Sequence, residues 1–304
     1  MKNVLITGIS GFVGINLVRH FANVPDIVLK GYSRSKVEGV EYLPNFSAMA
    51  LDETKIDTVI HLAGIAHDLS GQFTTEDYYR VNTEGTKALV EEVLKSNIEK
   101  FIYVSSIKAV CDTSSVPANE SIQPHPSSDY GKSKLKAEEY ILSKQWSSKS
   151  FYILRPGMMH GPGNKGNLNL LYQFVKTGMP FPLGAFHNQR SFLSIGNFCF
   201  VIEQLLSENK IESGIYHLAD DGFLSTKELY QLIAHTLNKK PVVWNLPTSV
   251  IEWCAKLVGR RAMISKLTEN MMISNQKITS AMAAPFPITM RDGLIQTIHS
   301  FDGK

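Results

Sequence analysis

The sequence is poor in cysteine, and its few cysteines form no pattern that indicates a metal site or a disulfide framework. The three thiols, Cys111, Cys199 and Cys254, are odd in number and lie far apart in a chain of 304 residues. The nine histidines show no paired spacing, so we expect no metal site. Free thiols are typical of a cytoplasmic protein.

Long apolar runs and clusters of one charge are also missing. No stretch approaches the roughly 18 apolar residues that cross a bilayer, and the apolar residues 4–6 are too few for a signal peptide. The net charge is +3 with no long run of lysine or arginine. We therefore expect no membrane span and no nucleic-acid partner, whereas a diffuse basic balance suits an anionic small molecule.

A glycine-rich turn follows the first predicted strand. Residues 4–6 have the apolar character of a strand buried on both faces of a parallel sheet, and a helical apolar pattern begins after the turn. Glycines let the backbone approach a pyrophosphate, whose charge the helix N-terminal amides meet. We predict dinucleotide contacts from Gly8, Gly11, Phe12, Val13 and Gly14. A glycine-rich turn without a ligand is the alternative.

The end of the second predicted strand, residues 27–32, bears on the choice of cofactor. NAD sites tend to place an acid here to bind the ribose 2′-hydroxyl, but Ser33 and Arg34 follow the strand. A guanidinium suits a 2′-phosphate. We therefore favour NADP(H) over NAD(H); the alternative is that Arg34 is only a solvated surface charge.

Strands and helices alternate through the first half of the chain. We expect further strands over residues 58–64, 101–106 and 151–154, with helices over 75–95 and from Tyr130 onward. Residues 41–57 give no clear strand, and residues 111–128, rich in Ser, Pro, Asn and Asp, indicate a loop over the site. This alternation predicts an α/β fold with a doubly wound parallel sheet.

The end of the predicted strand over residues 101–106 and the helix that begins at Tyr130 carry the candidate chemistry. Tyr130 and Lys134 are four residues apart and share one helix face, so the ammonium is expected to lower the pKa of the phenol. Ser106, at the end of the preceding strand, can hold a substrate oxygen beside the phenol. Tyrosine and lysine pairs at this spacing are also common on solvated helices, so other motifs in the chain have to indicate whether this pair is catalytic.

Several motifs in a fixed order resemble the extended short-chain dehydrogenase/reductase superfamily, in its NAD-dependent epimerase/dehydratase group. They are the glycine turn, His61-Leu62-Ala63-Gly64, Val81-Asn82-Thr83, Val104-Ser105-Ser106, Tyr130 with Lys134, and Arg155-Pro156-Gly157. The resemblance implies a Rossmann fold in which Tyr130 is the catalytic acid/base, Lys134 binds the nicotinamide ribose and Ser106 is the catalytic hydroxyl. One departure is Cys111, where family members often carry a glycine.

The resemblance also implies the remaining binding residues. Cofactor contacts are expected from Ser33, Arg34, Leu62, Ala63, Gly64, Asn82, Ser105, Pro156 and Gly157. Substrate contacts are expected from Ser106, Lys108, Asn167, Arg190 and Arg261, with Arg190 matching the arginine that contacts the sugar-nucleotide pyrophosphate. Family members commonly form homodimers through helices that correspond to residues 76–95 and 129–145.

Within the group, the sequence is similar to a branch that reduces UDP-4-keto-6-deoxy-N-acetylhexosamines in polysaccharide biosynthesis. Dehydration is disfavoured, because Ile107 and Lys108 stand where dehydratases carry an Asp-Glu pair. Two alternatives stay open, a UDP-sugar 4-epimerase and a cofactor-sensing regulator without catalysis. We expect a dinucleotide-binding domain over residues 1–160 and a sugar-nucleotide lobe over 161–304, with part of 190–220, including a strand at 214–218, returning to the large domain.

Overall fold

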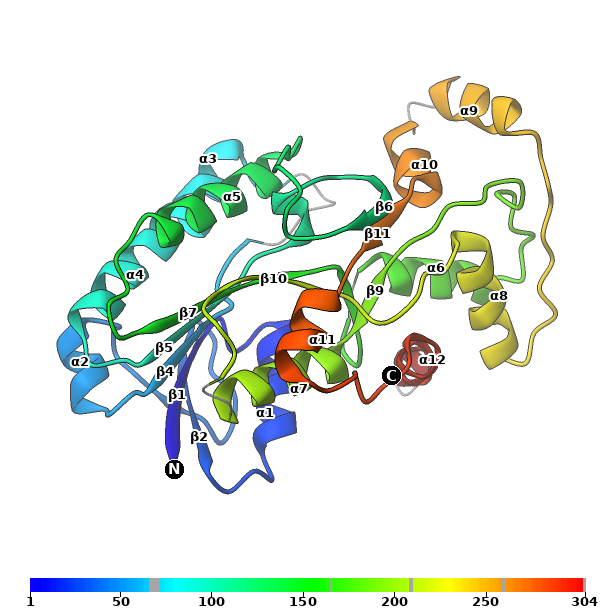
Figure 1. Cartoon of the computed structure of the whole chain (residues 1–304). Coiled ribbons are helices and arrows are strands. Elements are labelled where there is room, and N and C mark those ends of the chain that lie inside the picture. Colours follow the sequence, from blue (N-terminus) through cyan, green and yellow to red (C-terminus); the bar gives the residue numbers. More distant parts are fainter. Residues whose placement is uncertain (66–71, 165, 208–209, 258–260, 303–304) are drawn as a thin grey trace.

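A seven-stranded parallel sheet forms the centre of the molecule (Figure 1). The computed structural model describes residues 1–65, 72–164, 166–207, 210–257 and 261–302. The strand order is β10-β7-β5-β4-β1-β2-β3. The strands are β1 (Lys2–Thr7), β2 (Ile27–Tyr32), β3 (Glu41–Tyr42), β4 (Thr58–His61), β5 (Lys100–Val104), β7 (Ser150–Pro156) and β10 (Gly214–Leu218). The predicted doubly wound α/β fold is confirmed.

Helices cover both faces of this sheet, because its strands are apolar on both sides. One face packs against α1 (Phe12–Phe21), α7 (Ile195–Ser207) and α11 (Gln276–Met282). The other packs against α2 (Ala48–Glu53), α4 (Gly85–Lys95) and α5 (Asp129–Leu142). The fully buried Val4, Leu5 and Ile6 of β1 lie between the two layers. The carboxyl ends of β1, β4, β5 and β7 therefore meet at one edge.

A second group of elements, which we call the C-terminal lobe, has its own apolar core. Its helices are α6 (Asn167–Lys176), α8 (Thr226–Thr236), α9 (Thr248–Leu257), α10 (Arg261–Thr268) and α12 (Met290–Asp302). Two small parallel sheets adjoin it, β8 (Met158–His160) with β9 (Phe192–Ser194), and β6 (Ser114–Ala118) with β11 (Met271–Ile273). The chain crosses between the two parts, since β10 lies in the large sheet. The domain boundaries proposed from the sequence stay a prediction.

The structure contradicts one local expectation in part and adds detail to two others. The predicted loop 111–128 contains β6, whose partner β11 lies far away in the sequence and gives no local signal. The segment 41–57 contains β3 and α2. The predicted helix over 75–95 is present with these bounds, and within it a π-helical turn η1 (Tyr79–Glu84) separates α3 (Thr75–Tyr78) from α4. Such π-turns are frequent at functional sites, and this one contains Asn82.

None of the helices in the described ranges combines the length and apolar character needed to cross a bilayer.

Candidate active site

The glycine turn joins β1 to α1 at the carboxyl edge of the sheet. Gly8 has φ +71°, and a Cβ added there would lie 2.8 Å from the Ala63 backbone. At Gly14 an added Cβ would lie 2.2 Å from the Ile9 carbonyl oxygen. These positions therefore require glycine. No described side chain caps α1 at Gly11, so its first amides are available to an anion such as a pyrophosphate.

The end of β4 lies directly beside this turn. Leu62 and Ala63 donate backbone hydrogen bonds to the Thr7 oxygens at 3.1 and 3.3 Å. The fully buried Asn82 of η1 holds the next stretch, since its side chain bonds both the amide and the carbonyl of Ile65 at 2.8 and 3.1 Å. Gly64 therefore lies against the Asn82 side chain. The small residues Ala63 and Gly64 therefore leave the backbone open to close approach by a dinucleotide.

Ser106 and Tyr130 are brought together where β5 ends and α5 begins. The Ser106 hydroxyl caps the 3₁₀ turn η2 (Ile107–Ala109) by accepting from the Lys108 amide at 3.2 Å. Ser128 caps α5 by accepting from the Gly131 amide at 3.2 Å, which places Tyr130 in the first turn. The Ser106 and Tyr130 side chains are hydrogen-bonded to each other. The serine hydroxyl and the phenol, which both carry an exchangeable proton, therefore lie together at the carboxyl edge of the sheet.

The pKa of Tyr130 differs from the sequence-based expectation. Burial raises this pKa above its ordinary value, and the hydrogen bond with Ser106 opposes the rise. The Lys134 ammonium instead donates to the Val104 carbonyl at 2.9 Å and lies 4.7 Å from the centre of the Tyr103 ring. The prediction that Lys134 lowers the pKa of the phenol is therefore wrong for this structure. Burial lowers the pKa of Lys134 itself to about 8.

A buried ion pair lies one helical turn beyond Lys134. Glu138 and Arg155 have side chains only 1% and 3% exposed, and the guanidinium binds both carboxylate oxygens at 2.5 to 3.1 Å. The Ser105 hydroxyl donates to the same carboxylate. Glu138 also favours the charged form of Lys134. The pair therefore ties α5 to the ends of β5 and β7, the two strands that flank the candidate site.

The residues expected to contact substrate occupy separate elements. Lys108 forms an ion pair with Asp112 at 2.9 Å. Asn167 is exposed at the first position of α6. Arg190 donates to the Glu269 carbonyl at 3.1 Å, and its burial lowers its pKa. Arg261 begins α10, and its side chain lies outside those described.

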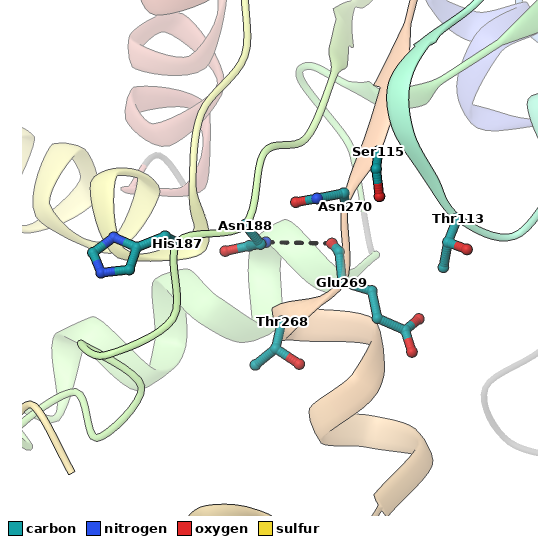
Figure 2. Close-up of a pocket in the computed structure, with 7 residues that line it drawn as sticks. All are labelled: Thr113, Ser115, His187, Asn188, Thr268, Glu269 and Asn270. Atoms are coloured by element: carbon teal, nitrogen blue, oxygen red, sulfur yellow. Dashed lines mark hydrogen bonds between the residues drawn. The ribbon is translucent and has the colours of Figure 1, made fainter. Parts of the chain in front are cut away.

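A polar cavity of about 440 Å³ lies next to Arg190 (Figure 2). It opens between β6 and the segments that precede β9 and β11, and Figure 2 shows its hydroxyl, amide and carboxylate groups. The lining residues are Thr113, Ser115, His187, Asn188, Thr268, Glu269 and Asn270. These side chains offer many donors and acceptors, which suits a ligand rich in hydroxyl groups.

Among the other predicted cofactor residues, Ser33 and Arg34 directly follow β2, and the Arg34 side chain is exposed. Pro156 and Gly157 lie at the end of β7, where the Gly157 amide donates to the Leu218 carbonyl at 2.9 Å. The predicted cofactor positions thus lie at or just beyond the carboxyl ends of β1, β2, β4, β5 and β7, with Asn82 in η1 and Lys134 on α5 beside them. This arrangement fits a bound dinucleotide.

Comparisons with known proteins agree with this geometry. The model of the NAD dependent epimerase/dehydratase family matches residues 4–219. The chain therefore belongs to this family, and it is an enzyme of the NAD-dependent short-chain dehydrogenase/reductase type. The UDP-glucose 4-epimerase of Vibrio cholerae is 30% identical to it, over 99% of this chain and 95% of that protein.

Solved structures share the fold over the whole chain. The UDP-N-acetylglucosamine 4-epimerase from Bacillus cereus superimposes with a TM-score of 0.80 at 21% identity, covering 100% of both chains. The complex of MoeE5 with UDP-glucose and NAD superimposes with a TM-score of 0.79 at 19% identity, covering 99% of both chains. These structures confirm the predicted fold, and the family model together with the Vibrio cholerae relative confirms the predicted family.

Sequence reasoning missed several polar contacts around the site. Tyr78 packs against Tyr130 with ring centres 6.2 Å apart. His61 bridges Thr7 and Thr86 at 2.6 and 2.9 Å, and burial lowers its pKa to about 3. Among the missed contacts, only that of Glu138 had a signal in the sequence. Glu138 follows Lys134 by four residues and therefore lies on the same helix face.

Proposed function

We propose that the protein transfers hydride between a nicotinamide cofactor and C4 of a UDP-sugar, and that it reduces the C4 keto group of a UDP-4-keto-6-deoxy-N-acetylhexosamine in surface-polysaccharide biosynthesis. The observation that carries the proposal is the hydrogen-bonded Ser106 and Tyr130 pair beside the buried Lys134, at the carboxyl edge of a dinucleotide-type sheet. A carbonyl that becomes an alcohol needs one proton donor and one orienting hydroxyl at this position.

In this proposal the three side chains have distinct roles. When bound, the reduced nicotinamide supplies the hydride that adds to C4. Tyr130 gives its phenolic proton to the substrate oxygen as the carbonyl becomes a hydroxyl, and Ser106 donates a hydrogen bond that orients this oxygen. The raised pKa of Tyr130 keeps the phenol protonated before the reaction. Lys134 binds the nicotinamide ribose.

The cofactor in this proposal is NADP(H), held by the residues at the strand ends. Gly8, Gly11, Phe12, Val13 and Gly14 contact the pyrophosphate, and Ser33 and Arg34 contact the 2′-phosphate. The further contacts are Leu62, Ala63, Gly64, Asn82, Ser105, Pro156 and Gly157. The exposed Arg34, with no acid directly after β2, supports an exchangeable NADPH.

Substrate contacts in this proposal come from four further residues. Arg190 binds the diphosphate, since a guanidinium offers a planar fork to phosphate oxygens. Lys108, Asn167 and Arg261 complete the site, and the polar cavity next to Arg190 suits the hydroxyl groups of the sugar nucleotide. Dehydration is not favoured, because Ile107 is buried and Lys108 is paired with Asp112, so neither supplies a second acid or base.

A UDP-sugar 4-epimerase is the second candidate. Its support is the likeness to the Vibrio cholerae UDP-glucose 4-epimerase over nearly the whole of both chains. An epimerase oxidises and then reduces the same carbon, so its cofactor stays bound and is not consumed. The Ser106, Tyr130 and Lys134 side chains serve both reactions.

Nicotinamide absorbance separates the two candidates. Purified protein is mixed with NADPH and a UDP-4-keto-6-deoxy-N-acetylhexosamine, and in parallel with UDP-glucose or UDP-N-acetylglucosamine alone. A stoichiometric loss of NADPH absorbance is expected for the reductase. Interconversion of UDP-glucose with UDP-galactose, or of the two N-acetyl sugars, without such loss would establish the epimerase instead.

We also infer a homodimer in the cytoplasm, formed through α4 and α5. These two helices pack side by side on one face of the sheet, so together they offer a surface for a four-helix contact (Figure 1). Sedimentation at several protein concentrations measures this assembly.

A further inference from the structure

Six large apolar side chains are exposed on α9 and on the extended segment that precedes it. We call this set the tryptophan surface, and it consists of Val242, Trp244, Leu246, Val250, Trp253 and Leu257. Trp253 is 63% exposed and Leu257 is 66% exposed. Figure 1 shows the segment and α9 along the edge of the molecule that lies away from the seven-stranded sheet.

The local backbone explains why these side chains face outward. The segment is hydrogen-bonded to the chain at Phe181, and Val243 packs against the core of the C-terminal lobe. Successive side chains of an extended segment point to opposite faces, so Val242, Trp244 and Leu246 point away from that core. On α9, Val250, Trp253 and Leu257 are spaced by three and four residues and therefore share one face.

Tryptophan is used in this chain in two different ways. The chain has three tryptophans, of which Trp146 is 7% exposed in the core beside α5. The other two, Trp244 and Trp253, both lie on the tryptophan surface. Exposed apolar patches of this kind mark interaction sites. Indole rings favour the boundary between water and lipid in particular, because their body is apolar and their N–H is polar.

Positive charge borders the same surface. Lys239 and Lys240 precede the segment, Lys256 lies on α9, and all three are exposed. Residues 239–257 contain one acid, Glu252. In a two-fold contact between copies this surface would face itself and bring like charges together, which disfavours a second copy as its partner. Anionic lipid headgroups complement lysine, while their acyl chains accept indole and leucine.

We propose that the tryptophan surface docks the protein on the surface of an anionic phospholipid bilayer, with α9 lying in the plane of the interface. Such peripheral binding needs no membrane-spanning helix. It also differs from the sugar-nucleotide chemistry proposed above, and neither proposal depends on the other.

Vesicle co-sedimentation of the full chain tests the proposal. The protein is expected to bind vesicles that contain phosphatidylglycerol, to bind vesicles of phosphatidylcholine alone much more weakly, and to show a blue shift of tryptophan emission on binding. Trp253→Ser with Leu257→Ser should lower the partition coefficient at least about tenfold. Lys239→Gln and Lys240→Gln should each lower it about fivefold at low salt.

Met49→Ser with Leu170→Ser is the matched control, because these side chains are 69% and 60% exposed on α2 and α6. It should bind like the wild type, and circular dichroism verifies that every variant is folded. The proposal is overturned if the wild type does not bind anionic vesicles or if both double variants bind equally. It is also overturned if sedimentation shows that Trp253→Ser with Leu257→Ser separates a dimer.

Discussion

The sheet edge and the C-terminal lobe hold their polar side chains in different ways. At the sheet edge, Asn82, Lys134 and Glu138 are buried and fixed by hydrogen bonds to other elements. In the C-terminal lobe, Asn167 is exposed and Arg190 is held through a backbone carbonyl. The sheet edge therefore fixes the positions of its polar side chains, whereas the exposed Asn167 of the C-terminal lobe is available to a ligand. Substitutions at the sheet edge should have the larger effects.

The largest effect is expected from Tyr130→Phe. Loss of the phenolic proton should lower kcat by roughly 10² to 10⁴-fold, while dinucleotide binding is kept. Tyr140→Phe is the control, since it removes a hydroxyl of the same helix that is bound to Glu91 and Lys144. Steady-state kinetics and dinucleotide titration measure both quantities. Undiminished turnover in Tyr130→Phe would favour a cofactor-sensing role or a different acid.

The next effect concerns the buried ion pair. Glu138→Gln leaves the Arg155 charge buried without its carboxylate, which should lower the free energy of unfolding by about 3–5 kcal/mol. Glu139→Gln is the matched control, because Glu139 is 50% exposed and pairs with Lys136 at the surface. It should cost less than about 1 kcal/mol. Urea unfolding measures both, and equal losses would refute the special role of the buried pair.

Lys134 should make stability depend on pH in a defined window. Its pKa in the folded chain is lowered to about 8, so between pH 8 and about 10 the unfolded chain binds more protons and stability rises with pH. Lys134→Met should reduce this rise by about 1–2 kcal/mol over that window. Lys132→Met, on the exposed face of the same helix, should leave the rise unchanged. An unchanged slope in Lys134→Met would contradict the lowered pKa.

The smallest effect is expected outside the buried region, at Arg34. Arg34→Asp should shift the ratio of kcat/KM for NADPH over NADH about tenfold toward NADH, which equals about 1.4 kcal/mol. Lys36→Asp makes the same charge change at a nearby exposed position and should shift the ratio far less. If Arg34→Asp and Lys36→Asp shift this ratio equally, Arg34 acts only through the overall electrostatic field and does not bind a 2′-phosphate.

Local patterns were sufficient to predict the sheet and the glycine turn. Residues 4–6 and the glycines after them carry their whole signal within a few positions, so the first strand, turn and helix followed from the sequence. The positions of Ser106 and Tyr130 also followed, because one ends a strand and the other starts a helix.

Contacts between distant segments could not be predicted in this way. The strands β6 and β11 pair although about half of the chain separates them in the sequence. Arg155 contacts Glu138 only because β7 packs against α5. The tryptophan surface was missed for a related reason. Its lysines and tryptophans are spaced along the chain and form no run, so only their exposure in the folded structure marks them.

Transfer of label from the cofactor to the sugar tests the central claim most directly. The purified protein is incubated with NADPH that carries deuterium in the transferable position and with a UDP-4-keto-6-deoxy-N-acetylhexosamine, and the product is examined by NMR. The account predicts one deuterium at C4 of the sugar for each NADPH consumed. A product without deuterium at C4, or epimerised sugar formed while the labelled NADPH stays intact, would contradict it.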